Sequence, residues 1–111
     1  MAKVAVELDR QAQRDLRKLH PDDHRAALRA MADVLTHEPL PANANDRALK
    51  GRAPWRRLRV GDRSRGTLAF GEHPRFGQRI LWRAVGNGES RRVARVIHRR
   101  DLERAVRTLG D

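Results

Sequence analysis

The 111-residue sequence predicts a small α+β domain. We expect an N-terminal strand and a helical hairpin to pack on a twisted antiparallel sheet, with a short helix at the C-terminus. Two observations predict this fold class. Apolar residues recur at helical spacing between residues 9 and 39, and they alternate with arginines at strand spacing from residue 55 onward. A chain of this length is expected to form one domain, residues 1–111, with one modest core.

The first elements are a strand and the two helices of the hairpin. Residues 3–8 alternate apolar and polar side chains, as a half-buried strand does. Asp9 is expected to cap a first helix with an apolar face of Ala12, Leu16 and Leu19. A second helix is predicted to begin at Pro21 and to be stopped by Pro39. Its expected apolar stripe consists of Ala27, Leu28, Met31, Ala32, Val34 and Leu35.

The remaining elements are mostly strands. Residues 39–54 are rich in Pro, Ala and Asn and are predicted to form a loop. Residues 55–60, 79–85 and 91–97 alternate as strands do, and the last is expected to be central because it is the most continuously apolar.

Turn and cap signals separate these segments. Gly61-Asp62 and residues 86–88 are turn signals, and Asp101 is expected to cap the final helix. Residues 63–78 are compatible with either an extra strand at 67–70 or an ordered loop.

The positive charge is concentrated in the second half of the chain. Residues 1–49 contain eight Lys/Arg and eight Asp/Glu, whereas residues 50–111 contain seventeen and six, which accounts for the whole net charge of +11. A one-sided field of this kind attracts polyanions, and nucleic acid is the first candidate. Arginine binds phosphate through two parallel hydrogen bonds. A GC-rich genome would also enrich arginine, so the positions of the arginines have to decide.

Other features exclude several classes of site. The chain has no cysteine, which excludes a disulfide framework, a thiolate nucleophile and a cysteine-based zinc site. The five histidines show no metal-binding spacing, so we expect no metal and no cofactor. The sequence has no signal-peptide pattern and no stretch long enough to span a membrane. We therefore expect a cytoplasmic protein that does not interact with membranes.

Four motifs resemble the RelE/ParE superfamily of toxins from bacterial type II toxin–antitoxin modules. They occur in the order of the family over nearly the whole chain: Leu49-Lys50-Gly51, residues 55–62 (WRRLRVGD), residues 79–82 (RILW) and residues 96–101 (VIHRRD). The resemblance implies a toxin that is neutralised by a cognate antitoxin protein. Two features depart from the family. Either Arg65 opens the arginine-led strand, or Arg79 does after the extra residues 63–78, and the RILW run followed by a Gly-Asn-Gly turn favours Arg79. The chain also has no tyrosine. RNA-cleaving members often use a C-terminal tyrosine, whose place falls near Glu103 or Arg104.

The resemblance also implies a set of site residues. RelE-like toxins cut mRNA in the ribosomal A site without a metal, and the family's catalytic arginines correspond to Arg57, Arg59, Arg79 and Arg99. Strand spacing places Trp55 on the face of Arg57 and Arg59, where an aromatic ring can stack on an RNA base. Further RNA-binding candidates are Lys50, Arg65 and Arg100.

Proton transfer has two candidates. His98 lies at the end of the last predicted strand beside Arg99, although a strand-end histidine is often only structural. Glu103 is the second candidate, and an acid in the first turn of a helix is often there because it suits the helix dipole.

Two other functions remain open at this point. A ParE-like toxin would have the same fold, bind DNA gyrase and cut nothing, and the missing tyrosine favours it. The arginine pairs at 57/59 and 99/100 favour the nuclease. A plain nucleic-acid-binding module is the third possibility, but the basic half has no pattern of a recognition helix.

Overall fold

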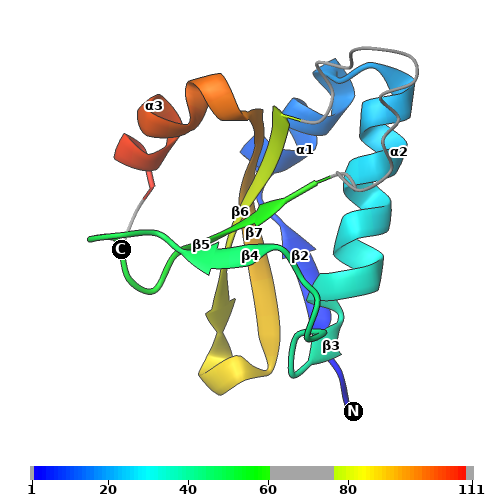
Figure 1. Ribbon diagram of the computed structural model, residues 1–111, viewed down its shortest axis with the longest axis vertical. Coiled ribbons are helices and arrows are strands. Elements are labelled where there is room, and N and C mark those ends of the chain that lie inside the picture. Colours follow the sequence, from blue (N-terminus) through cyan, green and yellow to red (C-terminus); the bar gives the residue numbers. More distant parts are fainter. Residues whose placement is uncertain (1, 61–76, 110–111) are drawn as a thin grey trace.

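One five-stranded sheet organises the chain in the computed structural model, which describes residues 2–60 and 77–109 (Figure 1). The strand order is β2 (Ala5–Leu8), β7 (Ser90–His98), β6 (Gln78–Val85), β5 (Arg56–Arg59) and β4 (Asp46–Ala48). The predicted α+β class is confirmed. The sheet is mixed rather than wholly antiparallel, because β2 pairs with β7 in the parallel direction and the other neighbours are antiparallel.

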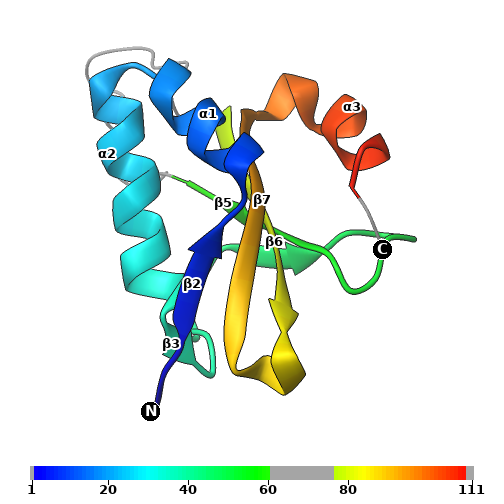
Figure 2. The ribbon, with the colours of Figure 1, turned by 180° about the vertical axis from the view of Figure 1, so that it is seen from behind.

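The predicted first strand is divided in two. β1 (Ala2–Lys3) pairs with β3 (His37–Glu38) in a separate two-stranded sheet, whereas β2 joins the main sheet beside β7 (Figure 2). Val4 lies between them, is buried, and donates its backbone N–H to Thr36 O at 2.8 Å. The strand that was expected to be central, β7, is an inner strand, but β6 occupies the middle of the sheet.

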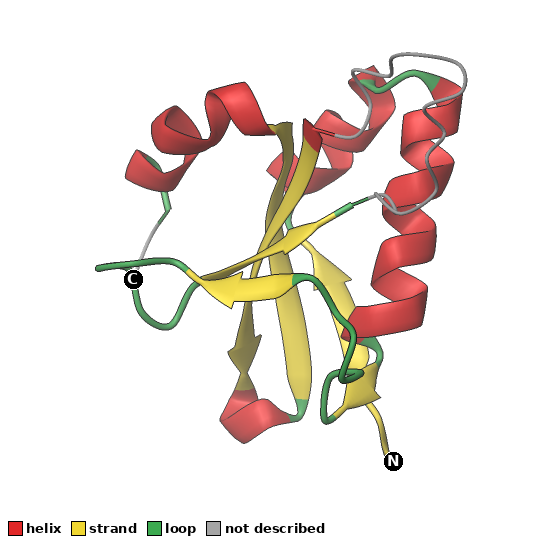
Figure 3. Cartoon of the chain, viewed as in Figure 1, coloured by secondary structure: helices red, strands yellow, loops and turns green. Residues whose placement is uncertain are grey.

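The predicted helical hairpin is present, but its capping and its buried residues differ from those expected. α1 (Arg10–Lys18) is followed by α2 (Pro21–Ala30), which continues into a π-helical turn at Met31–Leu35 (Figure 3). Asp9 stands at the start of α1, but its carboxylate accepts Arg92 Nε at 2.9 Å and makes no cap. Leu28 is 42% exposed rather than buried, because the buried side of α2 is set by positions 27, 31 and 35.

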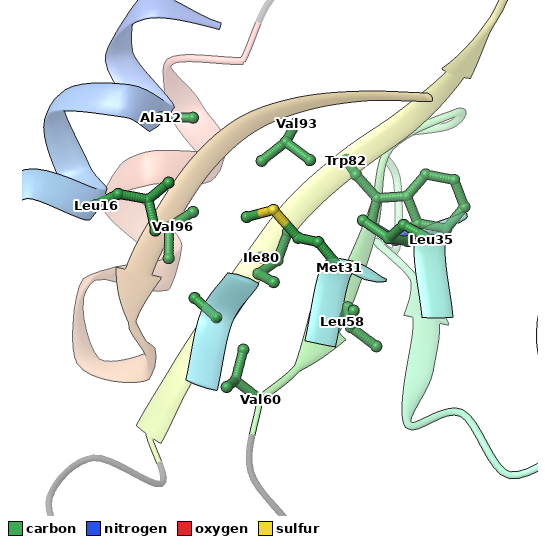
Figure 4. Close-up of a cluster of buried hydrophobic side chains, with 11 residues drawn as sticks. Ala12, Leu16, Met31, Leu35, Leu58, Val60, Ile80, Trp82, Val93 and Val96 are labelled. Carbon is green, nitrogen blue, oxygen red and sulfur yellow. The ribbon is translucent and has the colours of Figure 1, made fainter. Parts of the chain in front are cut away.

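The sheet is covered on both faces. α1 and α2 cover one face and enclose the main core, whose members include Leu16, Met31, Leu58, Ile80 and Trp82 (Figure 4). α3 (Leu102–Arg107) covers part of the other face above Leu81 and Ile97. A 3-10 turn at Arg99–Asp101 precedes α3, and Asp101 occupies the cap position without a side-chain cap bond. In the described part of the chain no helix is long and apolar enough to cross a bilayer.

The predicted loop at 39–54 contains the edge strand β4. Asp46 explains why this segment joins the sheet: its side chain is 2% exposed and accepts hydrogen bonds from Arg56 Nε at 2.6 Å and Trp82 Nε1 at 2.7 Å. One buried carboxylate therefore ties β4 to β5 and β6. The Gly61-Asp62 turn, the candidate strand at 67–70 and Arg65 lie outside the described residues.

Replacing Asp46 with alanine tests this connection. We expect the free energy of unfolding to fall by about 2–4 kcal/mol, because the Arg56 and Trp82 donors would lose a buried acceptor. Urea denaturation measures the change. The matched control is Asp33→Ala, since Asp33 is exposed and lies 3.9 Å from Arg29, and it should cost less than about 0.5 kcal/mol. Equal losses in both variants would contradict the role of Asp46.

Candidate functional site

The arginines of the sheet divide into two groups according to their partners. The first group is paired with acids. Arg56 binds Asp46, Arg91 binds Glu38, Arg92 binds Asp9, and Arg95 binds Asp15 at 2.8 Å. Arg91 also donates to the backbone oxygens of Leu35 and His37, and Asp15 also accepts the backbone N–H of Val96. These arginines hold helices and edge segments to the sheet, so their role is structural.

The second group has no acidic partner within residues 2–60 and 77–109. It consists of the four arginines predicted to be catalytic: Arg57, Arg59, Arg79 and Arg99. Arg59 of β5 lies directly opposite Arg79 of β6 in the antiparallel register. Like charges in that position destabilise a sheet. The described part of the fold therefore brings these cations together without an ion-paired acid.

The electrostatic effect on Arg79 is large. Arg79 is 6% exposed, and its Nη1 donates to the backbone oxygen of Gln78 at 3.0 Å. Burial, followed by the charges of Arg59, Arg57 and Arg99, lowers the pKa of Arg79 to about 10. This coupling places Arg99 in the same cluster, although Arg99 follows β7 in the 3-10 turn.

Arg57 and Arg59 carry hydrogen-bond donors that the fold does not satisfy. Burial, together with the charges of Arg59 and Arg47, lowers the pKa of the Arg57 guanidinium. Arg57 Nη1 and Arg59 Nε are buried and have no hydrogen-bond partner among residues 2–60 and 77–109. An unsatisfied buried donor costs about 1–3 kcal/mol, and more when the group is charged. An oxyanion such as phosphate would supply the missing acceptors and the missing charge.

The cluster lies on the face of the sheet that carries α3. Residues of β6 alternate between faces, and Leu81 packs in the small core beneath α3 while Ile80 packs in the main core. Arg79 therefore faces the α3 side, two residues from Leu81. We use the term arginine cluster for Arg57, Arg59, Arg79 and Arg99.

His98 lies on the other side. It follows Ile97, which packs beneath α3, and it lines a groove of about 480 Å³ with Asp15 of α1 and Leu19, the residue that follows α1. Its Nδ1 accepts the backbone N–H of Arg100 at 3.1 Å. Its ring also lies against Gly77, where an added Cβ would come within 2.4 Å of Nε2. The structure therefore does not bring the imidazole into the arginine cluster.

The other predicted site residues are placed as follows. Glu103 is exposed in the first turn of α3 and makes no ion pair with an arginine within the described residues. Lys50 is exposed in the turn before β5, and Arg100 is exposed at the groove of His98.

Trp55 has a different environment from the one expected. It is 2% exposed, and the guanidinium groups of Arg83 and Arg92 lie 5.6 and 5.7 Å from its ring centroid. The ring offers no open face to an RNA base in this structure. It serves instead as a platform for two arginines.

Sequence reasoning missed one cation of the site. Arg47 of β4 lies opposite Arg57 of β5, and its charge acts on the Arg57 guanidinium. Asp46 and Arg47 point to opposite faces of the sheet, as successive residues of a strand do. This alternation spans too few residues to predict a strand from the sequence. The described residues contain no group of three His, Asp or Glu side chains arranged to hold a metal ion.

Comparisons with known proteins address the fold. No family model matches the chain, and no curated protein matches it in sequence. A chain of the toxin–antitoxin complex RelBE2 from Mycobacterium tuberculosis is 24% identical with a TM-score of 0.64, covering 88% of this chain and 100% of that one. A chain of the archaeal RelE–RelB complex from Pyrococcus horikoshii is 17% identical with a TM-score of 0.56, covering 87% of this chain and 96% of that one. The protein has the fold of the RelE toxins.

Replacing Arg79 with methionine tests whether the cluster is unneutralised. Because the pKa of Arg79 is lowered to about 10 in the folded protein, above that pH the unfolded chain binds more protons at this position than the folded chain. The stability contribution of Arg79 therefore rises with pH and is lowest at neutral pH. Methionine removes the charge and keeps an apolar stem. We expect the free energy of unfolding at neutral pH to rise by about 1 kcal/mol or more.

Chemical denaturation measures this change, and Arg91→Met is the control. Arg91 is paired with Glu38 and two backbone oxygens, so its replacement should destabilise the protein. A loss of stability in Arg79→Met would indicate that the guanidinium of Arg79 is already neutralised in the folded protein.

Proposed function

We propose that this protein is the toxin of a type II toxin–antitoxin module and that it cleaves mRNA on the ribosome. One observation carries the proposal: the arginine cluster contains buried, unsatisfied donors and an opposed Arg59–Arg79 pair without an acidic partner in the described residues. Such an arrangement costs stability, which a protein retains where function requires it. The likeness in fold to chains of the RelBE2 and RelE–RelB complexes supports the toxin role.

The proposed reaction is an attack of a ribose 2′-oxygen on the adjacent phosphorus. The 2′-hydroxyl gives up its proton to water as the new P–O2′ bond forms. The P–O5′ bond breaks and the 5′-oxygen takes up a proton from water, so the products are a 2′,3′-cyclic phosphate and a free 5′-hydroxyl. Negative charge on the phosphoryl oxygens increases in the transition state, and fixed cations in a water-poor site stabilise it. We assign this role to Arg57, Arg59, Arg79 and Arg99. Arg79 is the most buried of the four and the most strongly coupled to the others.

The proposed protein partner is a cognate antitoxin. An antitoxin segment with carboxylates over the arginine cluster would neutralise it and exclude RNA. The segment would lie along the α3 face of the sheet, because that face carries the unpaired cations.

A ParE-like toxin that binds DNA gyrase is the second candidate. A specific observation favours it: in the described part of the chain, no carboxylate or imidazole forms a hydrogen bond or an ion pair with the arginine cluster. The chain also has no tyrosine. Under this alternative the arginines would bind acidic groups of a protein and cleave nothing.

Induced expression separates the two candidates. We expect growth arrest with mRNA cut at codon-specific positions, which sequencing of RNA ends would detect. Arg57→Gln combined with Arg59→Gln should reduce cleavage by roughly a hundredfold or more, because phosphate would lose two charged donors. The control is Arg25→Gln combined with Arg29→Gln, which removes the same charge from the exposed side of α2. Intact mRNA together with stalled replication would instead support the gyrase target.

His98→Gln tests the proton-transfer assignment made from the sequence. Because the His98 ring lies in the groove beside α1 and against Gly77, we expect the cleavage rate to stay within about tenfold of the native rate. A single-turnover assay on programmed ribosomes measures the rate directly. If the cleavage rate falls by more than about a hundredfold while RNA affinity is unchanged, the His98 imidazole takes part in proton transfer and this expectation is wrong.

A further inference from the structure

The edge strand β4 adds a fifth cation to the arginine cluster. Arg47 and Arg57 are direct partners in the β4–β5 register, and Arg59 and Arg79 are direct partners in the β5–β6 register. Arginines without an acidic partner in the described part of the chain therefore occupy three adjacent strands. Neighbouring strands are about 4.8 Å apart, so the row extends about 10 Å across the sheet.

Arg47 has the properties of a ligand-binding cation. Its neighbour Asp46 points into the main core toward Trp82, so the alternation of a strand places Arg47 on the face of Arg57. Arg47 is exposed, and within the described residues its side chain forms no hydrogen bond or ion pair. Its charge reaches the site, because it contributes to the lowered pKa of the Arg57 guanidinium.

Other cations near the site lack this combination of properties. Arg56 and Arg92 are paired with acids, and Arg83 lies over the ring of Trp55. Among the described residues, β4 is the last strand of the sheet and pairs with β5 alone. A single-stranded polyanion that leaves the arginine cluster across β5 would therefore meet Arg47 next.

We propose that Arg47 binds a backbone phosphate of the RNA next to the phosphate held by the arginine cluster. The bound strand then crosses the sheet from β6 over β5 to the β4 edge. This inference rests on the proposed ribonuclease function. It assigns Arg47 to substrate binding and the arginine cluster to the reacting phosphate.

The salt dependence of RNA binding tests the role of Arg47. The probe is a short fluorescein-labelled single-stranded RNA with a 2′-deoxy substitution that prevents cleavage, and anisotropy reports affinity over a series of salt concentrations. Each phosphate contact contributes about 0.7 to the slope of log affinity against log salt for a single strand. Arg47→Gln should lower the slope by about 0.7 and weaken binding several-fold.

Two further variants show whether the effect is local. Arg47→Lys keeps the charge and should keep the slope. Arg29→Gln removes the same charge from the exposed side of α2 and should leave both slope and affinity unchanged. If Arg47→Gln behaves like Arg29→Gln, the inference is wrong, and if Arg47→Gln alters only the binding of an antitoxin or of gyrase, it is also wrong.

The same titration distinguishes failure of this inference from failure of the proposed function. If the native protein binds RNA and Arg57→Gln with Arg59→Gln abolishes binding, the arginine cluster binds RNA, and Arg47→Gln alone decides the inference. If the native protein and that double variant bind RNA equally, the proposed function fails, and the inference fails with it. Circular dichroism of each variant establishes that it is folded.

Discussion

The opposition of Arg59 and Arg79 across β5 and β6 is the constraint on which the account of this protein depends. Two guanidinium groups face each other in a sheet, one of them almost fully buried, with no acid beside them in the described structure. Removing such charges from water is unfavourable unless they are paired. The surrounding fold holds this pair in place, and the proposed function assigns it to an anionic ligand.

Two buried acids outside the arginine cluster stabilise the sheet around the Arg59–Arg79 pair. Asp46 binds Arg56 and the Trp82 indole, and Asp15 binds Arg95 and the backbone of β7. Both carboxylates are contributed by segments outside the three central strands. The cations with structural roles are thus each paired with an acid, whereas Arg57, Arg59, Arg79 and Arg99 have no acidic partner among the described residues. The proposed function rests on this division.

The sequence allowed most of the fold and the members of the arginine cluster to be predicted, because both depend on short-range periodicity. Alternation in residues 55–60 and 79–85 placed Arg57, Arg59 and Arg79 on strands, and the structure pairs those strands. Contacts between residues far apart in the sequence could not be predicted from these patterns. The strand β4 depends on the burial of Asp46 against Trp82, and Arg47 was therefore missed. The face occupied by His98 depends on the packing of Ile97 beneath α3, and Trp55 lies against Arg83 of β6 and Arg92 of β7. None of these contacts is encoded in neighbouring residues.

The central claim is that the arginine cluster, and not the acid-paired arginines, receives phosphate. The most direct measurement is a nuclear magnetic resonance titration that follows arginine Nε–Hε signals while non-cleavable single-stranded RNA is added. We expect the signals of Arg59 and Arg79 to shift in a saturable manner, because these groups gain phosphate acceptors. The signals of Arg91 and Arg95 should stay in place, because their partners are already present. Unmoved signals from Arg59 and Arg79 at saturating RNA would contradict the account.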